Sequence, residues 1–81
     1  MSMSITVKQL KYLCSVADYQ HFTRAAEASF VTQSTLSAAI NDLEAQLGVK
    51  VFERNKRSVL VTPLGEKIIV QARIILGEVE D

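Results

Sequence analysis

The stretch Phe22–Gly48, FTRAAEASFVTQSTLSAAINDLEAQLG, holds two helix-forming segments with almost nothing between them. The first, Thr23 to Ser29, is short and rich in alanine, and Thr23 is a residue type that commonly caps a helix N-terminus. The second, Gln33 to Leu47, follows Thr32, another candidate cap, and ends before Gly48, which favours the left-handed end of a helix. Two helices joined so abruptly predict a helix-turn-helix.

The longer segment has one apolar face and one small polar face. Its apolar residues recur at helical spacing and predict the buried side: Leu36, Ile40, Leu43 and Leu47. The opposite side lacks bulky groups and carries Ser34, Ala38, Asn41 and Ala45. Such a helix can approach a surface closely, as a recognition helix does in the DNA major groove. We expect Phe30 and Val31, at the turn, to fill the core.

The flanking sequence predicts a mainly helical domain with a small hairpin. Thr6 and Gln9 form a capping-box pattern ahead of a first helix, about Val7 to Tyr19. After Gly48, β-prone residues at 49–52 and 59–61 enclose the basic stretch 53–58, which predicts a two-stranded wing. Thr62 and Pro63 start a last helix that we expect to run to the end of the chain. The predicted organisation is a winged helix-turn-helix over residues 1–62 and a linker helix over residues 63–81.

The composition is that of one small globular domain. The chain has 81 residues, of which 48% are hydrophobic and 22% charged. Its net charge of zero counts against nucleic-acid binding, but the basic stretch 50–57 and the acidic end 78–81 lie apart in the sequence. No apolar stretch is long enough to span a bilayer, so a cytoplasmic location is expected. One cysteine and one histidine, in no metal-site or nucleophile pattern, lead us to expect no enzyme activity, metal or cofactor.

Polar residues in the helix pair and the wing are candidates for DNA contact. Gln33 and Asn41 can pair with adenine, and Thr35 can meet a thymine methyl group. Helix starts attract phosphate, and wing cations can reach a phosphate or a narrow minor groove. The candidate DNA-binding residues are Thr23, Thr32, Gln33, Ser34, Thr35, Ser37, Asn41, Arg54 and Arg57.

Each candidate also has an ordinary structural interpretation. Thr23 and Thr32 can be helix caps alone, and the serines with Gln33 can be a solvated face. Arg54 and Arg57 can be surface charges that keep the hairpin edge soluble. His21 is expected in a loop or as a cap, and Cys14 as a small buried hydrophobe.

The last helix is apolar on two sides, so it needs two partners. One is its own domain, and the other is a second copy of the same helix, which predicts a homodimer. The candidate dimerisation residues are Ile68, Ile69, Ala72, Ile75, Leu76 and Val79.

The linked order of these parts resembles the N-terminal DNA-binding domain of LysR-type transcriptional regulators. The matching pieces are LKYLCSVADYQHFTRAA, VTQSTLSAAINDLEAQLGVKVFER and VTPLGE, which together cover almost the whole chain. They fit the family's "LE-x-x-LG-x-x-LF-x-R" lead into the wing and its "T-x-x-G" start of the linker helix. YQHFTRAAE and QARIIL also look like the peroxide-sensing OxyR branch.

This resemblance implies a dimer on an interrupted dyad of T-and-A-ended half-sites in double-stranded DNA. It implies recognition-helix contacts from the start of 33–47, a wing contact from Arg54, and an effector domain that this chain lacks. Higher oligomers are possible for a full-length protein. One departure concerns specificity: Ala38 and Ala39 stand where the family often has arginine or another long polar residue. The alternative function, favoured by the zero net charge, is a winged-helix module that binds protein and not DNA.

Overall fold

The computed structural model describes residues 4–55 and 58–77. In these ranges three helices, α1 (Val7–Tyr19), α2 (Phe22–Ala28) and α3 (Gln33–Leu47), precede a two-stranded wing and a last helix, α4 (Pro63–Leu76). The wing strands β1 (Phe52–Arg54) and β2 (Val59–Val61) are antiparallel, with Phe52 opposite Val61 and Arg54 opposite Val59. The predicted winged helix-turn-helix is confirmed.

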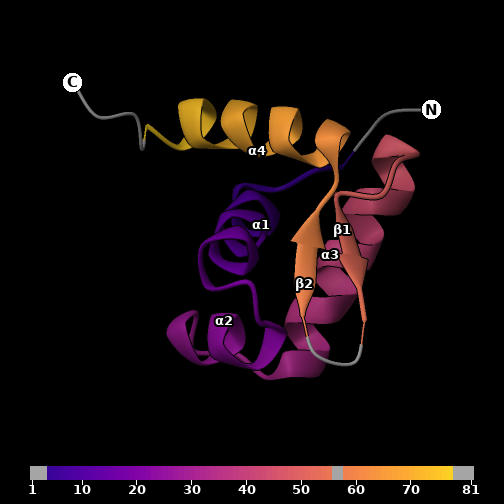
Figure 1. Ribbon diagram of the computed structural model, residues 1–81. Coiled ribbons are helices and arrows are strands. Elements are labelled where there is room, and N and C mark those ends of the chain that lie inside the picture. Colours follow the sequence, from indigo (N-terminus) through magenta and orange to yellow (C-terminus); the bar gives the residue numbers. More distant parts are fainter. Residues whose placement is uncertain (1–3, 56–57, 78–81) are drawn as a thin grey trace.

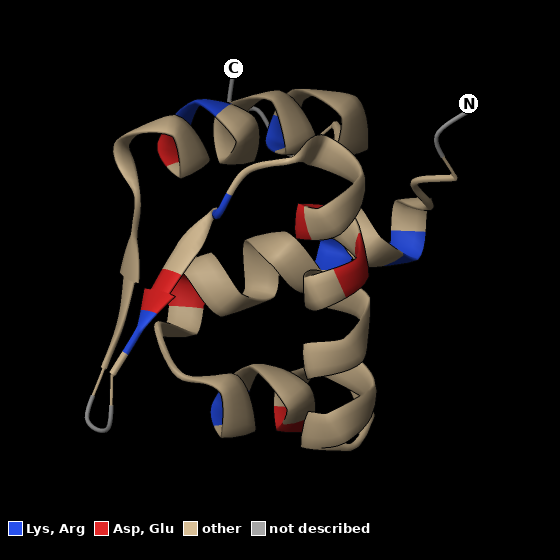
Figure 2. Ribbon diagram, turned by 90° about the vertical axis from the view of Figure 1, so that its right-hand side faces the viewer, with Lys and Arg blue, Asp and Glu red and all other residues tan. Residues whose placement is uncertain are grey.

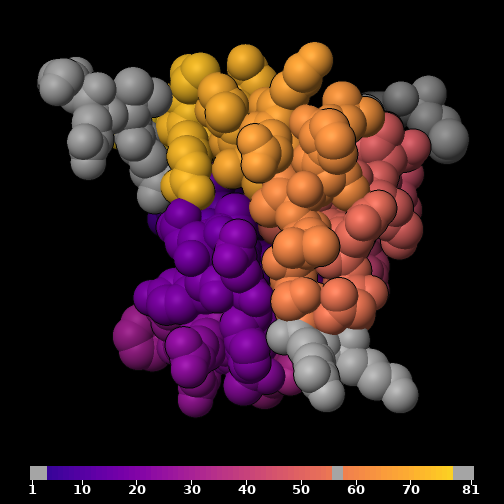
Figure 3. All heavy atoms as spheres, viewed as in Figure 1, coloured from indigo at the N-terminus to yellow at the C-terminus, as the bar shows by residue number. Residues whose placement is uncertain are grey.

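The helices surround one core, and the wing lies beside α3 (Figure 1). In that view α4 runs along one edge and α2 along the opposite edge, with α1 between them. The space-filling view shows the side chains of α4 lying directly on α1 (Figure 3). The most deeply buried side chains come from α1, α3 and the start of the wing: Leu13, Val16, Leu36, Ile40, Leu43 and Val51.

Three of the predicted helix starts are confirmed. The Thr6 hydroxyl accepts a hydrogen bond from the Gln9 N–H, and Gln9 Oε1 accepts one from the Thr6 N–H, so the capping box is complete. Thr32 caps α3 through the N–H of Thr35, and Thr62 caps α4 through the N–H of Gly65.

The predicted start of α2 was wrong. His21 is its N-cap, with imidazole Nδ1 accepting from the Arg24 N–H at 3.2 Å, so the capping interpretation of His21 is confirmed. Thr23 therefore lies inside the first turn, and its hydroxyl is available for another partner.

Two further expectations about the helix ends were wrong. Phe30 does not fill the core: it has a left-handed backbone (φ 58°) and is 94% exposed, while Val31 packs against the core. The last helix does not run to the end of the chain, because Gly77 closes it in the left-handed conformation (φ 73°). On α1, Leu13, Cys14 and Val16 are buried, so the expectation that Cys14 is a small buried hydrophobe is confirmed, whereas Val7 is exposed.

Polar contacts join the helices where their apolar faces end. Gln9 is buried, and its Nε2 donates to Asp42 Oδ2 at 2.8 Å, which connects α1 to α3. Arg73 on α4 pairs with Asp18 on α1 at 2.6 Å. Across residues 4–55 and 58–77, no helix combines the length and apolar character needed to cross a membrane.

Candidate nucleic-acid interface

The start of α3 is a cluster of hydroxyl groups held around its cap. Thr32 Oγ1 accepts from the Thr35 N–H at 3.2 Å and donates to Thr35 Oγ1 at 2.9 Å. Ser34 Oγ lies 3.2 Å from the same Thr32 hydroxyl. All three side chains are exposed, and Ser37 one turn later is half-buried. Unpaired N–H groups at this helix end, together with these hydroxyls, suit a phosphate or a base edge.

Gln33 is held in place by the preceding helix. The Thr23 hydroxyl donates to Gln33 Oε1 at 2.8 Å, which bridges α2 and the first residue of α3. This contact orients the exposed carboxamide and leaves its Nε2 group as a donor. Both residues also line a hollow of about 190 Å³ that reaches the wing at Asn55 and Ser58.

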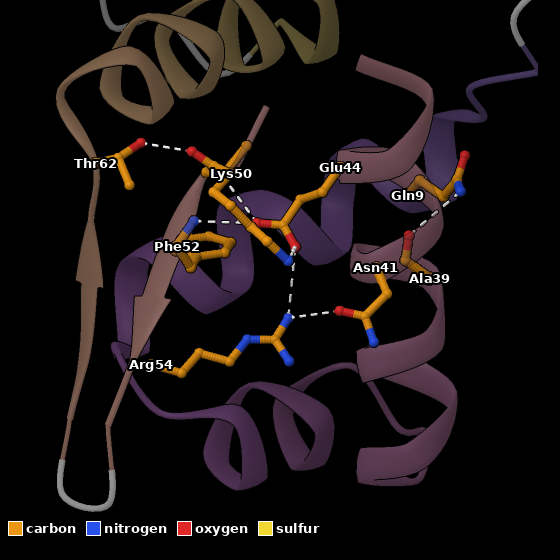
Figure 4. Close-up of polar contacts among 9 residues, drawn as sticks. Gln9, Ala39, Asn41, Glu44, Lys50, Phe52, Arg54 and Thr62 are labelled. Atoms are coloured by element: carbon orange, nitrogen blue, oxygen red, sulfur yellow. Dashed lines mark hydrogen bonds and ion pairs between the residues drawn. The ribbon is translucent and has the colours of Figure 1, made fainter. Parts of the chain in front are cut away.

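Asn41 lies on α3, two turns after Gln33, and contacts Arg54 of β1. Arg54 Nη2 donates to Asn41 Oδ1 at 3.0 Å, so the wing and α3 are joined at this point (Figure 4). A bidentate pairing of Asn41 with adenine requires the amide oxygen as well as the nitrogen. That oxygen already has a partner within the protein. Arg57 lies outside the described residues.

Between Gln33 and Asn41, the side chains on the outward face of α3 are small and uncharged. Ala38 is exposed, and residues 33–41 carry no charged side chain. Figure 2 shows that residues of both charge signs are scattered along the described part of the ribbon. Close approach by α3 is therefore sterically open, but residues 33–47 include no lysine or arginine to attract phosphate.

The candidate dimerisation residues differ in their exposure to solvent. Ile69 and Ala72 pack in the domain's own core, at 6% and 1% exposure, although Ala72 also lines an apolar groove beside α4. Ile68 and Leu76 are half-buried, Ile75 is 65% exposed, and Val79 lies outside the described residues. The apolar side chains that α4 exposes most are Leu64, Val70, Ile74 and Ile75.

Sequence comparison supplies the family. Residues 7–66 match the bacterial regulatory helix-turn-helix proteins of the lysR family. The chain belongs to the LysR family. It is the DNA-binding domain of a transcriptional regulator, and not an enzyme.

Three LysR relatives show the extent of the likeness. The chain is 46% identical to the HTH-type transcriptional regulator EstR of Acinetobacter baylyi and 43% identical to the dual regulator OxyR of Escherichia coli, in each case over 94% of this chain. It spans about a quarter of the length of these relatives. The solved complex of the CbnR DNA-binding domain with DNA superposes with a TM-score of 0.87 at 35% identity, over 89% of this chain and 83% of that one.

Two LysR motifs have a physical explanation in this fold. In "LE-x-x-LG", Glu44 is buried and accepts from the N–H groups of Val51 and Phe52, which fixes the start of the wing. In "T-x-x-G", a Cβ on Gly65 would lie 2.3 Å from the carbonyl oxygen of Val51, so a side chain is excluded. Sequence reasoning missed Glu44 as a site residue. The sequence did offer one indication: Glu44 follows Leu43 and lies on the border of the apolar stripe of this helix, where a side chain can be buried.

Proposed function

We propose that this LysR domain binds double-stranded DNA sequence-specifically, with the start of α3 in the major groove. The observation that carries the proposal is the exposed, uncharged and hydrogen-bonding start of α3, where Thr23 holds Gln33. A groove about 12 Å wide admits one helix, and base edges are read by side chains near the start of that helix. The hydroxyls of Thr32, Ser34 and Thr35 suit backbone or base contact at the same end.

The wing is proposed to lie along the DNA backbone or minor groove beside α3. Its strands place Asn55 and Ser58 at the same side as Thr23 and Gln33, since all four border one hollow. Cations in this part of the chain, Arg57 among them, would meet phosphate. A cytoplasmic location, where a bacterial regulator meets DNA, is part of the same proposal.

The proposed active form is a homodimer through α4. A largely apolar groove of about 600 Å³ runs beside this helix and is lined by Ile5, Val7, Leu10, Leu43, Leu47, Lys67, Ile68, Gln71, Ala72 and Ile75. A second copy of α4 suits this groove, because α4 exposes apolar side chains that would be buried by such contact. Symmetric pairing would cover both copies, and a two-fold dimer matches a dyad in DNA.

Selection from a library of randomised duplexes tests the proposal without knowledge of the promoter. The proposal expects enrichment of an interrupted dyad with T-and-A-ended half-sites. It also expects binding of the selected duplex to weaken as salt rises, because counterions are released from phosphate. Recovery of unrelated sequences after repeated rounds would contradict it and favour the protein-binding alternative.

A further inference from the structure

A buried carboxylate lies between α3 and the wing. Glu44 is 4% exposed, and its Oε2 accepts from the N–H of Val51 at 2.8 Å and from the N–H of Phe52 at 3.2 Å. A buried charge is costly unless it is paired and hydrogen-bonded. These two N–H groups satisfy one oxygen only. The other oxygen, Oε1, is buried and makes no hydrogen bond within the described residues.

Two cations lie near that second oxygen, and they differ in exposure. Arg54 Nη2 is 3.7 Å from Glu44 Oε1 with a side chain 36% exposed, and Lys50 Nζ is 4.0 Å away with a side chain 77% exposed. The exposed Lys50–Glu44 ion pair, at the limit of contact, contributes little to stability. The Arg54–Glu44 ion pair is partly shielded from water, so salt screens its attraction less. Arg54 is therefore the main counter-charge of Glu44 (Figure 4).

The Arg54 guanidinium makes two more contacts, and they come from both helices of the pair. Its Nη2 donates to Asn41 Oδ1 on α3 at 3.0 Å. Its central carbon lies 4.2 Å from the ring centre of Phe22 on α2, a cation–π distance. Phe22 in turn packs edge-on against Phe52 of β1, with ring centres 6.3 Å apart. The side chain of Arg54 thus touches α2 and α3 while its backbone belongs to the wing.

We propose that Arg54 is a positioning residue that fixes the wing against α3 and orients Asn41, and that it does not bind phosphate. This inference rests on the proposed function, since it assigns how one residue supports DNA recognition. A planar guanidinium can stack on a ring while it donates in its own plane, which a lysine ammonium cannot do. With its oxygen held by Arg54, Asn41 presents its Nδ2 group as a donor toward a base.

Binding of the selected duplex as a function of salt separates positioning from phosphate contact. A phosphate contact predicts that Arg54→Lys binds nearly as well as wild type. It also predicts that Arg54→Gln lowers the slope of log K against log salt by about 1. Positioning predicts that both variants lose affinity by about tenfold, equivalent to 1.4 kcal/mol, with the wild-type slope retained. Lys50→Gln is the matched control, because it removes a nearby charge and leaves the guanidinium contacts intact; its loss should be smaller.

A second measurement needs no variant. Nuclear Overhauser contacts between the Arg54 guanidinium and both the Phe22 ring and the Asn41 amide should persist in wild-type protein after the selected duplex is added. Their loss on DNA binding, or full affinity in Arg54→Lys, would overturn the proposal. If wild type selects no duplex, the proposed function fails, while the contacts in the free domain still report whether Arg54 fixes the wing.

Discussion

The hydroxyl of Thr23 donates a hydrogen bond to the carboxamide oxygen of Gln33 over 2.8 Å, so α2 sets the side chain that begins α3. The contact exists because His21, and not Thr23, caps α2. A side chain fixed before binding loses less conformational entropy on contact with a base.

Thr23→Ala should therefore reduce discrimination at the base that Gln33 reads, and not only overall affinity. The expected loss is about 0.5–1.5 kcal/mol, the usual net value of one hydrogen bond. Titration of matched and single-base-substituted duplexes measures it, with Thr23→Ser as the control that keeps the hydroxyl. If the losses from Thr23→Ala and Gln33→Ala simply add in the double variant, the two residues act independently and the coupling is refuted.

Ile75→Asp should produce monomers, because Ile75 is 65% exposed beside the apolar groove proposed for the partner helix. A charge buried in that interface would be unpaired and costly. Ile74→Asp is the matched control, since Ile74 is 52% exposed but does not line the groove. Sedimentation of both variants gives the mass; a dimeric Ile75→Asp with a monomeric Ile74→Asp would place the interface on the other flank of α4.

Gly65→Ala should destabilise the domain, because the added Cβ would lie 2.3 Å from the Val51 carbonyl oxygen and 2.8 Å from Thr62 Oγ1. The expected cost is about 1–3 kcal/mol or more, as for other overpacked sites. Gly48→Ala is a useful comparison, because its Cβ would meet no atom within 4 Å and the cost comes only from the positive φ of 72°. That strain is about 1–2 kcal/mol. Thermal unfolding of the two variants measures both, and a Gly65→Ala domain as stable as wild type would show that the wing shifts without cost.

The fold could be predicted from sequence wherever a local rule decides it. Thr6, Thr32 and Thr62 cap their helices as predicted because capping depends on residues three positions apart. Phe30 was misplaced because hydrophobicity alone predicts burial, whereas the turn needs a left-handed residue whose side chain faces solvent. Neither residue type nor spacing indicates that direction.

The site was less predictable, because its contacts join residues far apart in sequence. The sequence predicted Arg54 as a DNA-binding residue of the wing, but its partners within the fold are Glu44 and Asn41, 10 and 13 positions away, and Phe22 on α2. Only the packed wing brings these groups together. The sequence did not separate the buried side of α4 from the exposed side for a similar reason. The helix is apolar on two sides, so its periodicity does not show that Ile69 is buried and Ile75 exposed.

The claim that the start of α3 reads bases is tested most directly by Gln33→Ala. Wild type and variant are titrated against the selected duplex and against duplexes with single-base substitutions, at one fixed salt concentration. The account predicts that Gln33→Ala loses about 1–3 kcal/mol on the selected duplex and little on the duplex altered at the base that Gln33 reads. Equal losses on every duplex would contradict a base-reading role for Gln33.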